Sequence, residues 1–493
     1  MRDGKNYRIN IFNIPPWRIG VNLKNMLFAS YIVNLFTTNK TDYVMKANSE
    51  NGNNENDSFI EKKLNKISLE KLSKESEFSK RKSKKITAKD FLLGFFLMTH
   101  SRESQSYRNW AIKIGWLIKD RVSKQALWKK MGQAQITFLK EVLSSIMENS
   151  IEIERCDLHS EKLKVFKNII VEDSTNIQLD DKLKNEYPGN GYQNNNNKTA
   201  ILKVQAAYDI TRRKFIRFDI TSFRDNDQGY SPKIVQILKR GDLVIRDLGY
   251  FVLRVFQKLN KEGIFFISRM KKGVNVYSKK DEIVIDLAKM LKKRGKLDIE
   301  VFLGKKERLP VRLIALPVEE KIANQRRRKA KINRDLRCKP SKEHLYLLGW
   351  ELFITNVERE IISPNDIAQL YFIRWRIEII FKSWKSYFKI ISAPSYANKI
   401  RIESYIYCML IFITLFQVHF YNYYMAKTKS KIKEISLLRL MQFMTTNIEI
   451  VFMSALGDKV ITESFLFNQI NYYCFYESRT DRVNFHQKLL KLS

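Results

Sequence analysis

Gly241-Asp-Leu-Val-Ile-Arg-Asp-Leu-Gly-Tyr-Phe251 decides the fold, because a short apolar run ends there in an aspartate and a glycine turn. A helical pattern at 232–239 precedes it. A second helical pattern at 251–261 and an extended one at 263–268 follow. Residues 242–246 are therefore predicted to form a buried strand between helices, as in an α/β sheet.

Three extended runs lie upstream, at 166–171, 200–209 and 215–223, each rich in Ile, Val and Phe and bounded by polar loops. Runs that follow one another in this way predict an antiparallel meander. The full order is three strands, helix, strand, helix, strand. It predicts an α/β protein with an RNase H-like mixed-sheet core.

The chain carries a large excess of positive charge, with 89 Lys and Arg against 52 Asp and Glu and a formal net charge of +37. This imbalance favours polyanionic partners, of which DNA is the leading candidate, while RNA and membrane surfaces stay open. The cysteines lie far apart without a C-x-x-C pair, which argues against zinc and against a disulfide framework. With no signal-peptide pattern at the start, we expect a cytoplasmic protein.

The uncharged segment 405–424 is long enough to span a membrane. Its Thr414, Gln417, His419 and Asn422 are more typical of a helix buried in a large core. We expect a core helix and no membrane partner, and a membrane-attached basic protein is the alternative.

Residues 87–150 have helical spacing of apolar side chains. Within them, 120–130 predicts a turn, an N-capping Ser123 and a basic helix that follows another helix, the outline of a helix-turn-helix. Lys124 and Gln125 are its candidate DNA contacts. A basic surface helix in a small bundle would explain the same pattern equally well.

Changes of composition and period divide the chain into six segments. We expect a poorly defined N-terminal region with a polar linker at 1–85, a helical DNA-binding module at 86–160, two parts of the core at 161–269 and 363–425, a β-rich insertion at 270–362, and a helical C-terminal region at 426–493. Strands are expected in the insertion at 282–285, 297–302, 310–316 and 344–357, and the basic run 325–331 is expected to be a phosphate-touching loop.

Residues 366–388 predict one amphipathic helix that follows a Ser363 cap and Pro364. A polar stripe within about 60° of one helix face is left free by the apolar arc. It consists of Tyr371, Arg374, Glu378 and Lys385. An ordinary solvated face with an Arg374–Glu378 ion pair is the alternative.

Asp173 is predicted to end the first strand and Asp247 the fourth, which places both on neighbouring strands, where Glu378 joins them from the helix. Each aspartate alone could instead serve a turn. Three convergent carboxylates raise one another's pKa unless cations neutralise them. Oxygen ligands suit Mg²⁺ or Mn²⁺, and two such ions can drive in-line phosphoryl transfer, with Arg374 and Lys385 on the phosphates.

The pattern Y-x-x-R-x-x-x-E-x-x-x-x-x-x-K is complete at 371–385. Three further stretches add to this pattern, at 171–175, 241–251 and 350–356. Together they make the chain, over about residues 86–425, resemble a family of DDE transposases. This family is the type-four family of bacterial insertion sequences, which carries the YREK signature. The resemblance implies an RNase H-like core interrupted by a β-rich insertion. It also implies metal-dependent cut-and-paste transposition by a synapsed dimer on terminal inverted repeats, with Asp173, Asp247 and Glu378 as metal ligands.

In related enzymes a flipped base stacks on a tryptophan of the insertion, and Trp350 resembles that tryptophan in position. A core tryptophan is the alternative. Tyr371 is expected to help position the DNA.

Residues 225–229 look like the start of a calcium loop, but Gln236 stands where a glutamate is required, so we expect a polar loop. A DNA-binding relic or repressor at transposon ends remains the alternative to an active transposase.

Overall fold

The computed structural model describes residues 67–79, 85–100, 106–148, 161–189, 200–278, 284–332, 340–388, 390, 398–427, 435–448, 450–451 and 463–475. Most of the expected N-terminal region, half of the predicted strand at 282–285, and Cys156 and Cys338 lie outside these residues.

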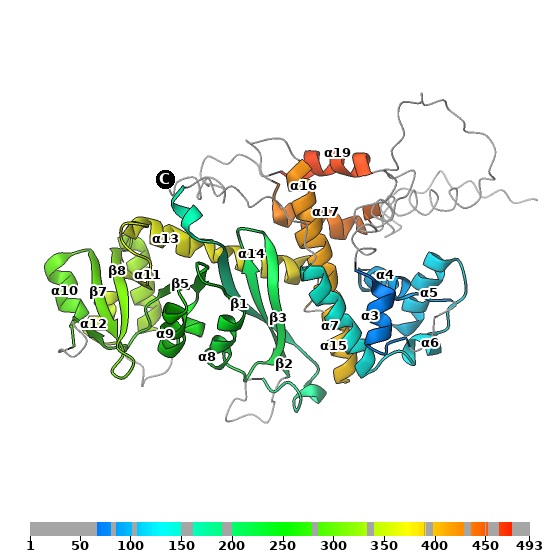
Figure 1. Ribbon diagram of the computed structural model, residues 1–493, viewed down its shortest axis with the longest axis horizontal. Coiled ribbons are helices and arrows are strands. Elements are labelled where there is room, and N and C mark those ends of the chain that lie inside the picture. The colour runs from blue at the N-terminus through cyan, green and yellow to red at the C-terminus, as the bar shows by residue number, and fades with distance from the viewer. Residues whose placement is uncertain are drawn as a thin grey trace, which may run out of the picture. The chain divides into compact units, whose positions relative to one another are not determined.

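One mixed sheet runs through the described part of the chain, in the strand order β3-β2-β1-β4-β5-β9-β8-β7-β6 (Figure 1). The strands are β1 (Ile169–Gln178), β2 (Ile201–Asp209), β3 (Lys214–Ser222), β4 (Leu243–Arg246), β5 (Phe265–Arg269), β6 (Val276–Tyr277), β7 (Leu297–Leu303), β8 (Leu309–Pro317) and β9 (Trp350–Thr355). β1, β2 and β3 pair antiparallel, so the predicted meander is confirmed. β1, β4 and β5 pair parallel, and the expected α/β class with a mixed sheet is confirmed.

The rest of the described chain is largely helical, and some of these helices pack on the two faces of the sheet. The α-helices of the described residues are α3 (Leu69–Glu75), α4 (Ala88–His100), α5 (Tyr107–Ile118), α6 (Lys124–Trp128), α7 (Gln133–Glu148), α8 (Asp227–Tyr230), α9 (Leu253–Lys261), α10 (Leu287–Arg294), α11 (Glu320–Lys331), α12 (Lys342–Leu347), α13 (Pro364–Ile373), α14 (Trp375–Ser386), α15 (Lys399–Ile413), α16 (Tyr421–Lys427), α17 (Leu437–Thr446) and α19 (Glu463–Tyr473). The 3₁₀ turns are η2 (Glu161–Val165), η3 (Asp181–Leu183), η4 (Ser231–Gln236) and η5 (Leu248–Tyr250). There is also a π-helical stretch, η8 (Thr414–Phe420). Val171 and Ile245 belong to one buried cluster, with α7, α14 and α15, whereas Ile170 and Val244 belong to another, with α9. The predicted helix at 232–239 is instead the shorter η4, preceded by α8.

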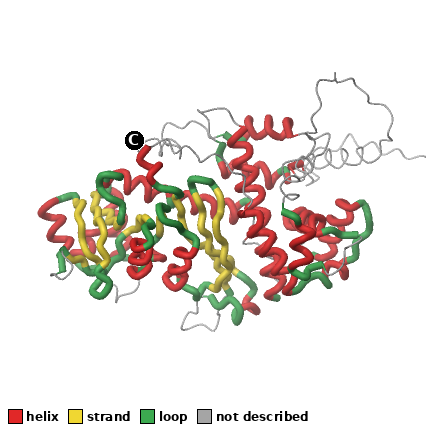
Figure 2. Tube along the Cα trace, viewed as in Figure 1, coloured by secondary structure: helices red, strands yellow, loops and turns green. Residues whose placement is uncertain are grey.

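The segment 270–362 continues the same sheet, because β9 pairs antiparallel with β5 and β8 pairs with β9. It also contains three of the described helices, α10, α11 and α12, so its β-rich composition was overestimated (Figure 2). The predicted strand at 344–357 was wrong over its first part. Ser341 accepts the backbone N–H of His344 and so caps α12, and β9 begins only at Trp350.

The basic run 325–331 is helical and not a loop, since it forms the second half of α11. Arg327 donates to Glu320 at 2.7 Å, one helical side-chain pair that supports this helix. Arg326 donates to Glu351 of β9 at 3.0 Å and so ties α11 to the sheet.

The predicted helix at 366–388 is divided at Arg374 into α13 and α14. Its start is as predicted, with Ser363 accepting the Asp366 amide and Pro364 in the first turn. At the break the Arg374 amide donates to Tyr371 O at 3.1 Å, an i to i−3 bond that tightens the chain locally. The spacing of apolar residues does not reveal this break, because the break leaves the apolar arc on the buried side.

Among the described residues, one helical stretch, Lys399–Tyr424, is long and apolar enough to cross a membrane. The most apolar 18 residues of this stretch are wholly buried inside the protein. α15 packs against α7 (Figure 1). Ser404 of α15 donates to Gln135 of α7 at 2.9 Å. The expected core helix is therefore confirmed.

Candidate active site

Asp173 and Asp247 lie side by side on neighbouring strands, because the parallel register of β1 and β4 pairs Glu172 with Arg246. Asp247 directly follows β4, as predicted. Asp173 does not end its strand, since β1 continues to Gln178 in its pairing with β2. The prediction of a strand end was wrong because polar residues after Asp173 still make ladder hydrogen bonds.

Arg374 joins two of the three carboxylates. Its Nη1 donates to Asp173 Oδ2 at 3.1 Å, and its Nη2 donates to Glu378 Oε1 at 2.5 Å. Only 15% of the Arg374 side chain is exposed. The i,i+4 ion pair considered from the sequence therefore exists, but it is largely buried and shared with β1, unlike a solvated surface pair.

Tyr371 holds the third carboxylate, since its hydroxyl donates to Asp247 Oδ1 at 3.2 Å. The phenol ring is buried, and the guanidinium groups of Arg374 and Arg269 lie 5.7 and 5.3 Å from its centroid. Burial and the neighbouring Asp247 raise the pKa of Tyr371 to about 12, so its hydroxyl stays a donor at neutral pH. The stripe predicted to be free is thus packed on the sheet at Tyr371 and Arg374.

Burial raises the pKa of Asp173 from 3.8 to about 6. The Ser174 amide, which donates to Asp173 Oδ1 at 2.8 Å, and Arg374 act in the opposite direction. Asp247 and Glu378 raise the pKa further by repulsion. Asp247 and Glu378 are therefore near enough to Asp173 to affect its ionisation, and such crowding of carboxylates favours a cation among them.

The donor set fits a hard divalent cation, because it consists of carboxylate oxygens without sulfur or imidazole. Within the described ranges, no three carboxylate, imidazole or thiol groups are close enough to hold a metal ion as they stand. Arg374 is the positive charge beside Asp173 and Glu378. A metal ion held by these carboxylates would supply the same kind of neutralising charge.

The remaining candidate residues lie away from these contacts. Lys385 is exposed on α14. Trp350 is partly buried at the start of β9, with its ring 6.2 Å from that of Tyr346, so it is neither a full core residue nor an open platform. Lys124 and Gln125 are exposed on α6, whose Ser123 cap is confirmed, but this helix has only 5 residues.

Sequence reasoning missed Arg269, which ends β5 and lies over the Tyr371 ring. Glu351 of β9 accepts a hydrogen bond from Arg269 at 3.1 Å and holds it there. The available signal was a charged residue at the end of an apolar strand beside β4. That signal is weak until the pairing of β5 with β9 is known.

The sequence of this chain is similar to those of known transposases. The family model described as "Transposase DDE domain" matches residues 164–415. The transposase for insertion sequence element IS231E of Bacillus thuringiensis subsp. finitimus is 29% identical over 367 residues, covering 70% of this chain and 76% of that protein. The transposase for IS1151 of Clostridium perfringens is 28% identical over 366 residues, covering 69% and 74%.

Among solved structures, a piggyBac transposase synaptic complex with hairpin DNA aligns over 88% of each chain at 10% identity, with a TM-score of 0.41. This value is too low for a comparison of the folds. The family match spans more than half of the chain and includes Asp173, Asp247 and Glu378. The chain therefore belongs to the DDE transposases of bacterial insertion sequences, as its YREK signature predicts.

Proposed function

We propose that this transposase cleaves DNA at the terminal inverted repeats of its own element and joins the ends to target DNA, with Asp173, Asp247 and Glu378 as the metal ligands. The observation that carries the proposal is the convergence of these carboxylates through two side chains of the broken helix. Arg374 contacts Asp173 and Glu378, and Tyr371 contacts Asp247.

Two Mg²⁺ or Mn²⁺ ions held by these carboxylates would activate a water or a 3′-hydroxyl and stabilise the leaving oxygen of an in-line displacement. Asp173 must lose its proton to serve as a ligand. If the ions displaced Arg374 from Asp173 and Glu378, its planar guanidinium would bind a DNA phosphate. Tyr371 keeps Asp247 oriented throughout by its hydrogen bond.

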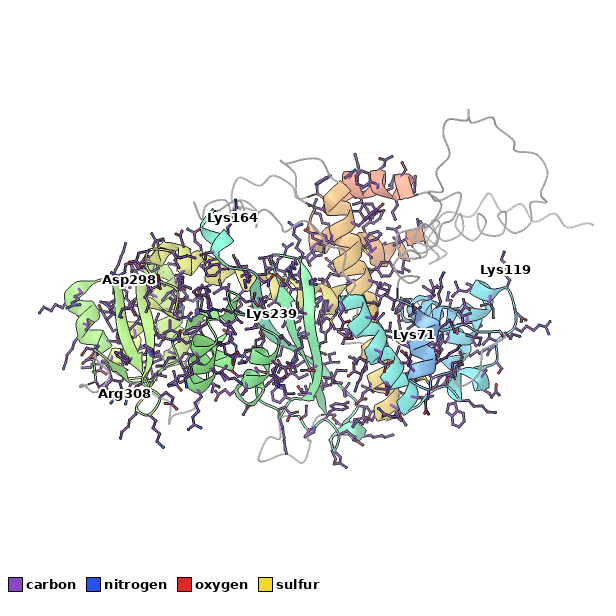
Figure 3. The ribbon with its side chains drawn as sticks, viewed as in Figure 1. Lys71, Lys119, Lys164, Lys239, Asp298 and Arg308 are labelled. Atoms are coloured by element: carbon purple, nitrogen blue, oxygen red, sulfur yellow. The ribbon has the colours of Figure 1, made fainter. Side chains whose placement is uncertain are left out.

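The strand order β3-β2-β1-β4-β5, with β1 parallel to β4 and β5, supports an RNase H-like core at 161–269 and 363–425. The segment 270–362 would be its insertion and 86–160 its DNA-binding module. Exposed lysines such as Lys119, Lys164 and Lys239 are spread over the chain, and the net charge of +37 suits double-stranded DNA (Figure 3).

We assign the remaining candidates to the DNA. Lys385 would bind a phosphate next to the carboxylates, and Trp350 would receive a flipped base. Lys124 and Gln125 would contact the end. The active form would be a homodimer that synapses two ends in the cytoplasm, since cutting and joining two ends of one element requires both at once.

The test uses a labelled duplex that carries an inverted repeat read from the DNA flanking the gene. The unaltered chain should nick it in Mn²⁺ or Mg²⁺ and not in chelator. Asp247→Ala and Glu378→Gln should bind this duplex with unchanged affinity but cleave at least about 10³-fold more slowly, because each removes a metal ligand. Asp181→Asn, an exposed carboxylate outside the site, is the matched control.

Normal cleavage by either ligand variant would refute the assignment of the metal site. Tight binding of the end by the unaltered chain, without cleavage in either metal, would instead identify a DNA-binding relic or repressor.

A further inference from the structure

The residues immediately before the two aspartates form a buried ion pair. Arg246 Nη2 and Nε donate to Glu172 Oε2 at 2.6 and 3.0 Å. Arg246 is 0% exposed and Glu172 is 2% exposed. Because side chains alternate along a strand, Glu172 points to the sheet face opposite Asp173. The pair therefore lies behind the carboxylates without touching them.

This pair links the two strands that carry the aspartates. Glu172 and Arg246 are directly matched in the parallel register of β1 and β4. A slip of one residue would turn one charge to the other face and leave its partner buried without a counter-charge, which is strongly unfavourable. The pair therefore favours the register in which Asp173 and Asp247 are level.

A second connection joins the residues that follow the aspartates. Ser174 donates to Asp227 Oδ1 at 3.4 Å, and Gln205 Nε2 donates to the same oxygen at 2.9 Å. The hydroxyl of Tyr250, in the turn after Asp247, donates to Gln205 Oε1. Asp227 thus connects the segments after both aspartates, across the same sheet face as the ion pair.

Stability alone gives no reason for charges at this place. Removing two ions from water costs several kcal/mol each, and apolar replacement of a buried pair is often neutral or stabilising. Arg246 Nη1 is also buried without a hydrogen-bond partner in the described part of the structure. An apolar pair would fill the space without this cost but would not distinguish one register from the next.

We propose that Glu172 and Arg246 are positioning residues, which hold Asp173 and Asp247 at the separation needed for shared metal binding. The inference rests on the proposed metal site. Their role acts through the strands, since both side chains are buried and lie on the sheet face opposite the carboxylates.

The test is the double variant Glu172→Leu/Arg246→Met in the full chain. We expect an unchanged or higher urea midpoint and unchanged affinity for the inverted-repeat duplex. Cleavage at saturating DNA should fall at least about tenfold, and half-maximal cleavage should need several-fold more Mn²⁺, because displacements near 1 Å impair catalysis. The matched control is Arg217→Met/Asp219→Leu, an ion pair at 2.8 Å whose two partners lie on the single strand β3.

Unchanged cleavage and unchanged Mn²⁺ dependence in the double variant would overturn the proposal. A double variant that does not fold would also overturn it, because the ion pair would then serve stability. Arg246→Lys keeps the charge and should fold, with an intermediate rise in the Mn²⁺ requirement; a normal requirement would also count against positioning. Mn²⁺ binding measured by electron paramagnetic resonance separates the two proposals. An unaltered chain that binds no Mn²⁺ refutes the metal site itself, whereas equal binding by both chains refutes only the role of the pair.

Discussion

Replacing Asp173 by asparagine should stabilise the fold while it abolishes cleavage. Burial raises the pKa of this carboxyl from 3.8 to about 6, even with the Ser174 amide and Arg374 acting against it. Between these two pH values the folded chain holds a proton that the unfolded chain releases. The contribution of Asp173 to the free energy of unfolding is therefore greatest below pH 3.8 and is lost as the pH rises through 6.

The magnitude follows from the shift. At about 1.4 kcal/mol per pH unit, a pKa near 6 instead of 3.8 costs about 3 kcal/mol above pH 6. Asparagine keeps a similar volume and an acceptor for the Ser174 amide but has no charge to bury. We expect Asp173→Asn to gain about 3 kcal/mol at pH 8 and about half of that at pH 5, by the same linkage.

The assay is urea unfolding in chelator, with the exposed Asp181→Asn variant as the control. Chelator is required because a bound cation would favour the ionised carboxyl and hide the effect. A gain of the same size at pH 5 and pH 8 would show that ionisation is not its cause. A loss of stability at pH 8 would refute the reasoning, because the ion pair with Arg374 would then outweigh burial.

Three further outcomes are expected. Tyr371→Phe removes the hydrogen bond to Asp247, which is worth about 1.5 kcal/mol for a charged acceptor. Single-turnover cleavage should therefore slow about tenfold while affinity for the duplex stays normal, and weaker duplex binding with a normal rate would contradict this. Lys385→Ala should weaken binding of any duplex and lower the salt dependence by about one phosphate contact, measured by fluorescence anisotropy at several salt concentrations; an unchanged slope would place Lys385 off the DNA. Trp384→Ala, at a fully buried position, should cost about 3–5 kcal/mol in urea unfolding, and a loss below about 1 kcal/mol would contradict the packing of α14.

Local pattern was sufficient for much of the fold. The runs at 201–209 and 214–222 are strands within one residue of their predicted bounds, because dense β-branched and aromatic residues between polar loops leave few other choices. Pattern failed at 342–347 and 320–331. Those segments are helical, and their short apolar and basic runs carry no period that separates helix from strand or loop.

The sequence by itself determined the family and which carboxylates are candidates, because Asp173, Asp247 and Glu378 stand in a complete motif with fixed spacing. Tertiary structure alone decided their partners. Arg374 reaches Asp173 across 201 residues of sequence, and Arg246 reaches Glu172 across 74. Such contacts depend on strand register and on the break between α13 and α14. Both are set by the packing of distant segments, which no local period records.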